Sequence, residues 1–122
     1  MHAHPCVLLV DDDPLVLLTA TASARAAGLA PVSASDGEEA LGLLTAGLSP
    51  ALVVTDLDMP RLDGVGLLAA VRALHAERGP HTIMFSAEQR PSRNGGADLW
   101  LSKNAPAALD TAFREFVAAT ER

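Results

Sequence analysis

Two short apolar runs that end in aspartate constrain the fold of this chain more than any other feature. One run covers residues 7–10 and precedes Asp11, Asp12 and Asp13, and the other covers residues 51–55 and precedes Asp56. Short, partly β-branched apolar runs are typical of buried strands. If the two strands lie side by side in a parallel sheet, their carboxyl ends gather these acids at one edge. Carboxylates so close together oppose each other's ionisation, so the cluster predicts a bound cation.

Strand-like and helix-like segments alternate along the rest of the chain. Capping acids precede the first two helical patterns and glycines follow them. We expect strands at about residues 6–10, 30–35, 51–55, 81–85 and 99–101, and helices at about 14–27, 36–46, 65–77 and 107–119. We expect the third helix to bury Leu67, Leu68, Val71 and Leu74. The alternation predicts one α/β domain over residues 1–122, with helices on both faces of a parallel sheet and the functional crevice beyond the carboxyl ends of its strands.

Composition excludes several classes of function. The chain has 122 residues, 49% hydrophobic, and a net charge of −6, so we expect a folded domain that does not bind nucleic acid phosphates. The single cysteine, Cys6, permits no internal disulfide and suits a cytoplasmic protein. No apolar run approaches the ~20 residues of a membrane span, and no signal peptide is predicted. His2 and His4 could ligate a metal, but we interpret residues 1–5 as a frayed polar terminus.

Polar residues that follow four of the predicted strands form a chemically coherent set. Asp11, Asp12 and Asp56 offer the hard oxygen ligands that suit Mg²⁺ or Mn²⁺. Asp56 can also act as a carboxylate nucleophile that forms an acyl phosphate. Lys103 supplies a positive charge for a phosphoryl oxygen, and Ser86 supplies a hydroxyl donor. Together they predict a site for phosphoryl chemistry.

The sequence closely resembles the receiver domain of two-component response regulators, the CheY-like family. The resemblance covers nearly the whole chain, and its motifs are VLLVDDDP at 7–14, SDGEEAL at 35–41, VVTDLDMP at 53–60 with LDG at 62–64, FSA at 85–87 and GADLWLSK at 96–103. It implies a doubly wound, five-stranded parallel sheet in the flavodoxin-like order 2-1-3-4-5, which is also the order of CheY.

The resemblance also implies a role for each residue of the site. Asp56 is expected to be the phosphoacceptor, with Ser86 bonding to the phosphoryl group and Lys103 pairing with it. Trp100 takes the position of the family's aromatic switch.

The metal ligands follow from the same resemblance. Asp12 and Asp56 are expected to bind Mg²⁺ directly, and Asp11 is expected to reach it largely through water. Asp58 is expected to contribute its backbone carbonyl.

Partners and mode of action are implied as well. A receiver takes its phosphoryl group from a histidine kinase or a histidine phosphotransfer protein and signals through a downstream protein. We expect no membrane among its partners. It catalyses its own phosphorylation without being a conventional enzyme, and slow self-dephosphorylation is expected. In this family the first helix contacts the phosphodonor, and Leu15, Leu17 and Leu18 cannot all face the core. We therefore expect Leu15 and Leu18 to form a docking surface.

Two departures from the family pattern change these expectations. The family's lysine is usually followed by proline, often in a cis peptide, whereas here it is followed by Asn104. Because a non-proline cis bond costs ~2.5–4 kcal/mol, we expect a trans bond. Only ten residues separate Ser86 from Ala97, and they include Pro91 and two glycines, so the fourth helix is predicted to be shortened or missing. Phosphorylation is then expected to order this connection, which lies between Ser86 and Trp100.

Two alternatives come from other functional classes. Residues 55–58 also resemble the Asp-x-Asp nucleophile motif of haloacid-dehalogenase phosphatases, although Pro60 replaces the usual Thr or Val and the chain is short for that family. The other alternative is a degenerate receiver that binds partners without phosphorylation. Asn104 and the short connection favour it, whereas Lys103 and the complete set of acids oppose it.

Overall fold

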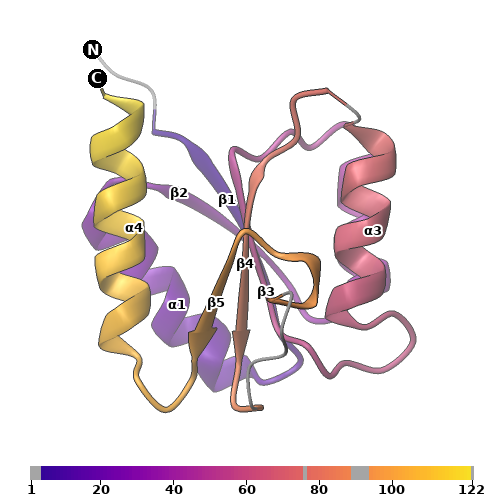
Figure 1. Cartoon of the computed structure of the whole chain (residues 1–122), viewed down its shortest axis with the longest axis horizontal. Coiled ribbons are helices and arrows are strands. Elements are labelled where there is room, and N and C mark those ends of the chain that lie inside the picture. The colour runs from indigo at the N-terminus through magenta and orange to yellow at the C-terminus, as the bar shows by residue number, and fades with distance from the viewer. Residues whose placement is uncertain (1–3, 76, 89–93, 122) are drawn as a thin grey trace.

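The structure is a computed structural model, and it describes residues 4–75, 77–88 and 94–121. His2 and Pro91, which entered the sequence predictions, lie outside the described residues. Strands and helices alternate along the described chain, as the sequence predicts (Figure 1). In chain order they are β1 (Cys6–Val10), α1 (Pro14–Ala27), β2 (Ala30–Ala34), α2 (Gly37–Thr45), β3 (Leu52–Thr55), α3 (Gly64–Leu74), β4 (His81–Ser86), β5 (Leu99–Ser102) and α4 (Ala107–Thr120).

The five strands form one parallel sheet in the order β2-β1-β3-β4-β5, which confirms the predicted fold. The register aligns the strand ends: Val10 lies beside Thr55, and Ser86 lies beside Ser102. Residues that directly follow these strands therefore reach the same edge of the sheet. This register brings the acids, the serine and the lysine of the predicted site together.

Aspartate side chains begin the first three helices. Asp13 accepts the N–H of Leu15, and Asp36 accepts the N–H of Glu39, at 2.9 and 2.8 Å. Asp63 caps α3 in the same way. Such caps satisfy backbone donors that have no partner within the helix. Asp13, Asp36 and Asp63 are therefore structural carboxylates that begin helices.

The core consists of two layers, one on each face of the sheet. Helices α1 and α4 cover one face, where Phe113 and Leu109 are buried, and α2 and α3 cover the other (Figure 1). Leu67, Leu68 and Val71 of α3 are buried as predicted. Leu74 is 46% exposed, so its predicted burial is wrong. The helix ends at this residue, three positions before the predicted end, and the core covers it only as far as Val71.

The described part of the connection between β4 and β5 holds a single 3₁₀ turn, Asn94–Gly96. This agrees with the predicted shortening of the family's fourth helix, and the label α4 accordingly belongs to the last helix of the chain. The turn packs on α3 and β5, and Arg72 of α3 donates a hydrogen bond to the carbonyl of Gly96. Gly95, with φ +61°, lies close to the side chains of Trp100 and Met84, and a Cβ added there would be 3.3 Å from each of them. The turn thus packs closely against Met84 of β4 and Trp100 of β5.

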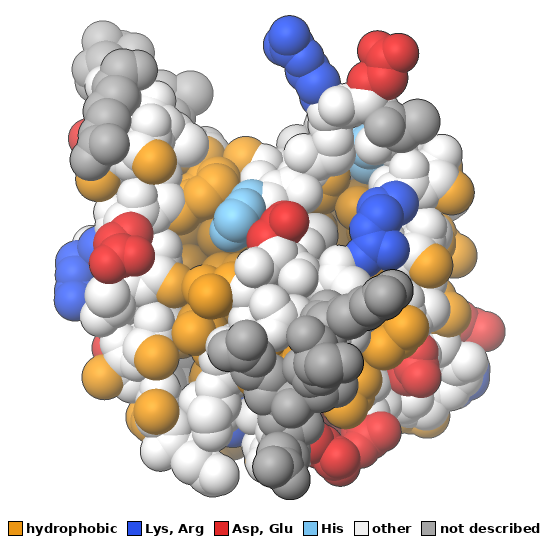
Figure 2. Space-filling model, viewed as in Figure 1, with side chains coloured by type: hydrophobic (Ala, Val, Ile, Leu, Met, Phe, Trp, Pro, Cys, Tyr) orange, Lys and Arg blue, Asp and Glu red, His pale blue; other side chains and the backbone are white. Residues whose placement is uncertain are grey.

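The described helices can also be compared with the requirements of a membrane span. None of them combines the length and the hydrophobicity needed to cross a bilayer. On the face that Figure 2 shows, acidic and basic side chains are scattered among apolar ones.

Candidate phosphoacceptor and metal site

Three carboxylates meet at the carboxyl edge of the sheet, where the sequence predicts them. Asp11 and Asp12 follow β1, and Asp56 follows β3. Each offers an oxygen, and these oxygens lie within 4.8 Å of one another. Asp11 and Asp56 are buried, whereas Asp12 is exposed. The backbone holds the cluster in place, because the N–H of Asp56 donates to the carbonyl of Val10 at 2.9 Å.

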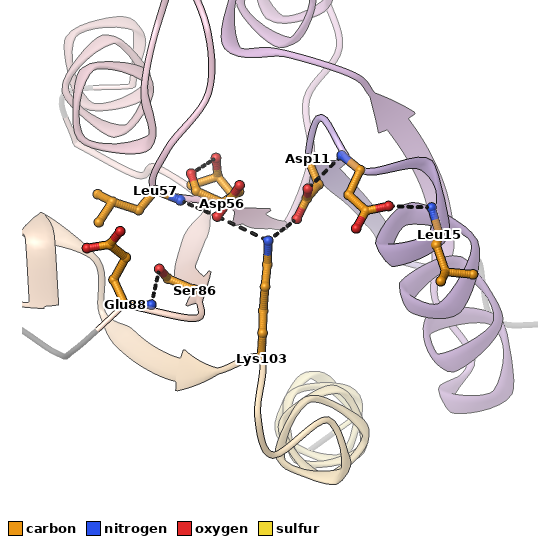
Figure 3. Close-up of polar contacts among 9 residues, drawn as sticks. Asp11, Leu15, Asp56, Leu57, Ser86, Glu88 and Lys103 are labelled. Atoms are coloured by element: carbon orange, nitrogen blue, oxygen red, sulfur yellow. Dashed lines mark hydrogen bonds and ion pairs between the residues drawn. The ribbon is translucent and has the colours of Figure 1, made fainter.

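Lys103 is the only lysine of the chain, and its ammonium group reaches this cluster. Its Nζ lies 2.7 Å from Oδ2 of Asp11 and 3.2 Å from Oδ1 of Asp56. The side chain rises from the loop after β5 and ends between the two carboxylates (Figure 3). Its side chain is only 19% exposed, so this contact is shielded from water more than a surface ion pair would be.

Burial and charge shift the pKa values of these groups. Burial raises the pKa of Asp56, and the negative charge of Asp11 raises it further. Lys103 and the backbone N–H of Leu57 act against this rise without cancelling it. For Lys103 itself, burial lowers the pKa, but its contacts with Asp11 and then with Asp56 outweigh burial and raise the pKa above the usual lysine value. The site therefore holds a protonated lysine and more negative charge than this lysine can neutralise.

The residues present fit a hard divalent cation. Three carboxylates with oxygens within 4.8 Å of one another, two of them buried, form an all-oxygen donor set. Mg²⁺ prefers such oxygen ligands. Burial and then the negative charge of Asp11 raise the pKa of Asp56, and a bound cation would act against both effects by favouring the ionised carboxylate.

Ser86 and two further acids line the other side of Asp56. Ser86 ends β4 and is buried, and its Oγ accepts the N–H of Glu88 at 3.0 Å (Figure 3). Glu88 and Asp58 are both exposed, and a hydrogen bond with Asp58 raises the pKa of Glu88. The sequence predictions placed Ser86 and Asp58 here but missed Glu88. Its position two residues after Ser86 could have indicated it.

Trp100 lies behind the site, on the side of the sheet that α2 and α3 cover. It is buried, and it pairs in register with Met84, two residues before the pair of Ser86 and Ser102. Successive side chains of a strand point to opposite faces, so Trp100 and Ser102 share a face of the sheet, as do Met84 and Ser86. The predicted switch residues are thus neighbours along one face.

The two leucines predicted for docking project from the first turns of α1. Leu15 and Leu18 are 67% and 68% exposed, whereas Leu17 packs against the core. Leu15 also borders a largely apolar groove of about 240 Å³ between α1 and α4. The stem of Lys103 lines the same groove, so the apolar surface is continuous with the acidic site.

Two contacts near the site were not anticipated from the sequence. Arg61, with φ +72°, forms ion pairs with Asp36 and Glu38 and so ties the β3–α3 loop to the start of α2. The hydroxyl of Ser102 accepts the N–H of Asn104 at 3.0 Å. No cis peptide occurs among the described residues, so the bond before Asn104 is trans, as predicted.

Comparison with known proteins gives one consistent result. The family model for the response regulator receiver domain matches residues 7–111. The Gliding motility regulatory protein of Myxococcus xanthus is 34% identical over 102 residues, which cover 80% of this chain and 13% of that protein. The Two-component response regulator ORR1 of Oryza sativa subsp. japonica is 36% identical over 111 residues, which cover 80% of this chain and 48% of the relative. The chain thus spans less than half the length of these relatives.

Solved structures show the same fold. The Francisella response regulator 1452 receiver domain superposes with a TM-score of 0.80 at 27% identity, covering 96% of this chain and 99% of that one. A CheY-like response regulator receiver domain protein from Methanospirillum hungatei gives a TM-score of 0.83 at 24% identity, with 98% of both chains covered.

Proposed function

We propose, because the chain belongs to the response regulator receiver domain family, that it is a phosphoacceptor of a two-component phosphorelay. The observation that carries the proposal is the arrangement of Asp56, which lies among two further carboxylates and in contact with a protonated lysine. The same arrangement speaks against the alternative of a degenerate receiver, because the acids and Lys103 are assembled in one site. The phosphatase alternative loses its basis with the family assignment.

Asp56 is the proposed nucleophile. One of its carboxylate oxygens forms the new P–O bond while the P–N bond of a donor phosphohistidine breaks, and the released imidazole nitrogen takes up a proton. In this proposal Lys103 pairs with a phosphoryl oxygen, and the hydroxyl of Ser86 donates to another. Self-catalysed phosphorylation followed by slow self-dephosphorylation is part of this proposal.

Receiver domains bind Mg²⁺ at an acidic pocket, and this chain has such a pocket. When bound, the ion supplies positive charge that lets an anionic phosphoryl group approach the carboxylates. We assign direct contact to Asp12 and Asp56, water-mediated contact to Asp11 and a backbone carbonyl contact to Asp58. Mn²⁺ fits the same oxygen donors.

The proposed partners follow from the surface and the family. A histidine kinase or histidine phosphotransfer protein donates the phosphoryl group, and Leu15 and Leu18 form part of its docking surface. A downstream protein target reads the phosphorylated state. A cytoplasmic location suits these partners.

Mass spectrometry after incubation with acetyl phosphate or phosphoramidate and Mg²⁺ tests the proposal. Wild-type protein should gain the mass of one phosphoryl group, and chelation of Mg²⁺ should prevent this. Asp56→Asn should gain none. Asp63→Asn is the matched control, because Asn keeps the helix cap and the residue stands outside the cluster. Labelling of Asp56→Asn at the wild-type level would show that the acceptor has been assigned to the wrong residue.

A further inference from the structure

Three hydrogen bonds hold the turn after β5, and one of them involves a side chain to which the family assignment gives no role. Three consecutive backbone N–H groups, those of Lys103, Asn104 and Ala105, all donate hydrogen bonds. Lys103 donates to the carbonyl of Ser86 at 3.0 Å, and Ala105 donates to the carbonyl of Ser102 at 3.1 Å. Asn104 donates to the hydroxyl of Ser102 at 3.0 Å. Ser102 therefore supplies two of the three acceptors that fix the backbone around Lys103.

The position of this backbone decides where the ammonium of Lys103 can reach. A lysine side chain has a flexible four-carbon stem, so a fixed starting point limits the positions of its end. Here Nζ must reach Asp11 and Asp56 together, at 2.7 and 3.2 Å. A change in the turn moves the start of the stem and alters both contacts.

The hydrogen bond from residue 104 depends on the kind of residue at that position. Proline has a fixed φ and no backbone N–H, so a proline at 104 could not donate to a serine hydroxyl. Asn104 has the N–H, and a serine hydroxyl commonly accepts from the residue two positions later. Ser102 thus supplies a local constraint at a site where the family usually has a proline.

We infer that the hydroxyl of Ser102 is a positioning group for Lys103, and that through this hydrogen bond it holds the lysine ammonium against Asp11 and Asp56. The part of this inference that concerns phosphoryl transfer rests on the proposed function. Ser102 itself is a positioning residue, because its hydroxyl contacts the backbone of the turn and not the carboxylates.

Two variants of nearly identical shape separate the hydroxyl from the side chain's bulk. Ser102→Thr keeps a hydroxyl, and Ser102→Val replaces that hydroxyl with a methyl group. Both suit a strand end, because both are β-branched. Ser102→Ala provides a second variant without the hydroxyl, should the valine disturb folding. Thermal unfolding of all three identifies any variant that is not folded.

The lone lysine provides a readout that needs no phosphoryl group. Because Lys103 is the only lysine of the chain, protein labelled with ¹³C,¹⁵N-lysine gives one set of side-chain NMR signals. In the absence of Mg²⁺ and phosphodonor, Ser102→Thr should keep the wild-type Cε and Nζ shifts. Ser102→Val and Ser102→Ala should move them toward those of a solvated lysine. A role confined to stability would lower the melting temperature but leave these shifts unchanged in the folded variants.

Labelling with phosphoramidate and saturating Mg²⁺ gives the functional arm. Ser102→Val should be phosphorylated about two- to tenfold more slowly than Ser102→Thr, the factor that one ordinary hydrogen bond supplies. Equal lysine shifts in folded threonine and valine variants would overturn the positioning role. Equal labelling rates despite different shifts would overturn its contribution to phosphoryl transfer. Different lysine shifts in a protein that no donor phosphorylates would uphold the positioning of Lys103 and refute the proposed function instead.

Discussion

Lys103 lies closer to Asp11 than to the proposed phosphoacceptor: its Nζ is 2.7 Å from Oδ2 of Asp11 and 3.2 Å from Asp56. Its hydrogen bond to Asp11 is also the largest of the effects that raise its pKa. The lysine therefore acts as a built-in counter-cation of the acid pair. A metal ion bound by the same carboxylates has to share them with this charge.

The first prediction follows from this competition. Lys103→Met should bind Mg²⁺ more tightly, by roughly tenfold, because a positive charge that repels the ion has been removed. In metal-free protein the same change should lower the free energy of unfolding by about 1–3 kcal/mol, because two carboxylates lose their partner. Titration calorimetry and urea unfolding measure the two effects. Arg72→Met, which removes a cation on α3, is the control and should leave Mg²⁺ affinity unchanged.

The second prediction concerns the pH dependence of stability. Asp56 titrates at about 3.9 in the unfolded chain and at a higher pKa in the folded one. Between these two values the folded protein binds more protons, so the free energy of unfolding falls as the pH rises through this window. Above the window the ionised carboxylate destabilises the fold. Metal-free Asp56→Asn should then be more stable than wild type at neutral pH, by on the order of 1 kcal/mol.

Urea unfolding in the presence of a chelator, from about pH 3 to neutral, checks this sign. The advantage of Asp56→Asn should shrink as the pH falls and vanish where Asp56 is protonated in both states. Glu115→Gln, which changes an exposed acid on α4, should show a much smaller effect. An advantage of Asp56→Asn that grows on acidification would contradict the predicted direction.

Metal binding should reverse this order of stability. At 100 times its dissociation constant, a ligand that binds only the folded state adds ~2.7 kcal/mol of stability. Mg²⁺ should therefore stabilise wild-type protein, and this gain should be strongly reduced in Asp12→Ala and in Asp56→Asn. Thermal unfolding followed by calorimetry, with and without Mg²⁺, measures this gain in stability. An unchanged gain in Asp12→Ala would remove Asp12 from the set of ligands.

Much of the fold and the site was predictable because each rests on local signals. Apolar runs that end in Asp11 and Asp56 identify strands and place their acids at one edge, and Asp13 with Pro14 identifies a helix start. The sheet order came from the family resemblance, because local signals do not fix which strands become neighbours. The structure confirms both the elements and the order.

The remaining features depend on contacts between distant or unpatterned residues. Arg61 pairs with Asp36 across 25 positions of sequence, and no periodicity connects them. Leu74 follows the helical period of α3, but the period does not say where the core stops covering the helix. Ser102 lies within the motif at 96–103, but its role depends on the N–H of Asn104, which departs from the family pattern.

Docking of the phosphodonor provides a further prediction. Leu15 and Leu18 are about two-thirds exposed, at 67% and 68%, and burying one such side chain in an interface contributes ~1.5–3 kcal/mol. Leu15→Asp or Leu18→Asp should therefore slow transfer from a cognate histidine donor by about tenfold or more. Labelling by acetyl phosphate should be unchanged, because the small donor needs no docking surface.

The structure offers a matched control for this experiment. Leu74 on α3 is also exposed, at 46%, but it lies on the other side of the sheet. Leu74→Asp should leave transfer from the protein donor unaffected. If both α1 variants fold and accept phosphate from the donor at the wild-type rate, the docking surface lies elsewhere.

The last prediction concerns how phosphorylation reaches the surface. The turn Asn94–Gly96 packs on Trp100 through Gly95, and the N–H of Ala97 closes it by donating to the carbonyl of Asn94 at 3.0 Å. Trp100 is buried beside this turn, so a movement of the tryptophan must displace or tighten it. We expect binding of the phosphate mimic beryllofluoride with Mg²⁺ to order this connection, one of the known modes of switching.

Amide hydrogen exchange at Ala97 measures this ordering, with the fluorescence of Trp100 as a second signal. Protection of the Ala97 N–H should rise about fivefold, which corresponds to ~1 kcal/mol for one closed hydrogen bond. The prediction extends to the residues from Glu88 onward, although 89–93 lie outside the described residues. Asp56→Asn should show no response to the mimic, and Arg72→Ala should start from lower protection because it loses the bond to Gly96. Unchanged exchange at Ala97 in wild-type protein that has bound the mimic would favour a rigid short connection and leave Trp100 without a switching role.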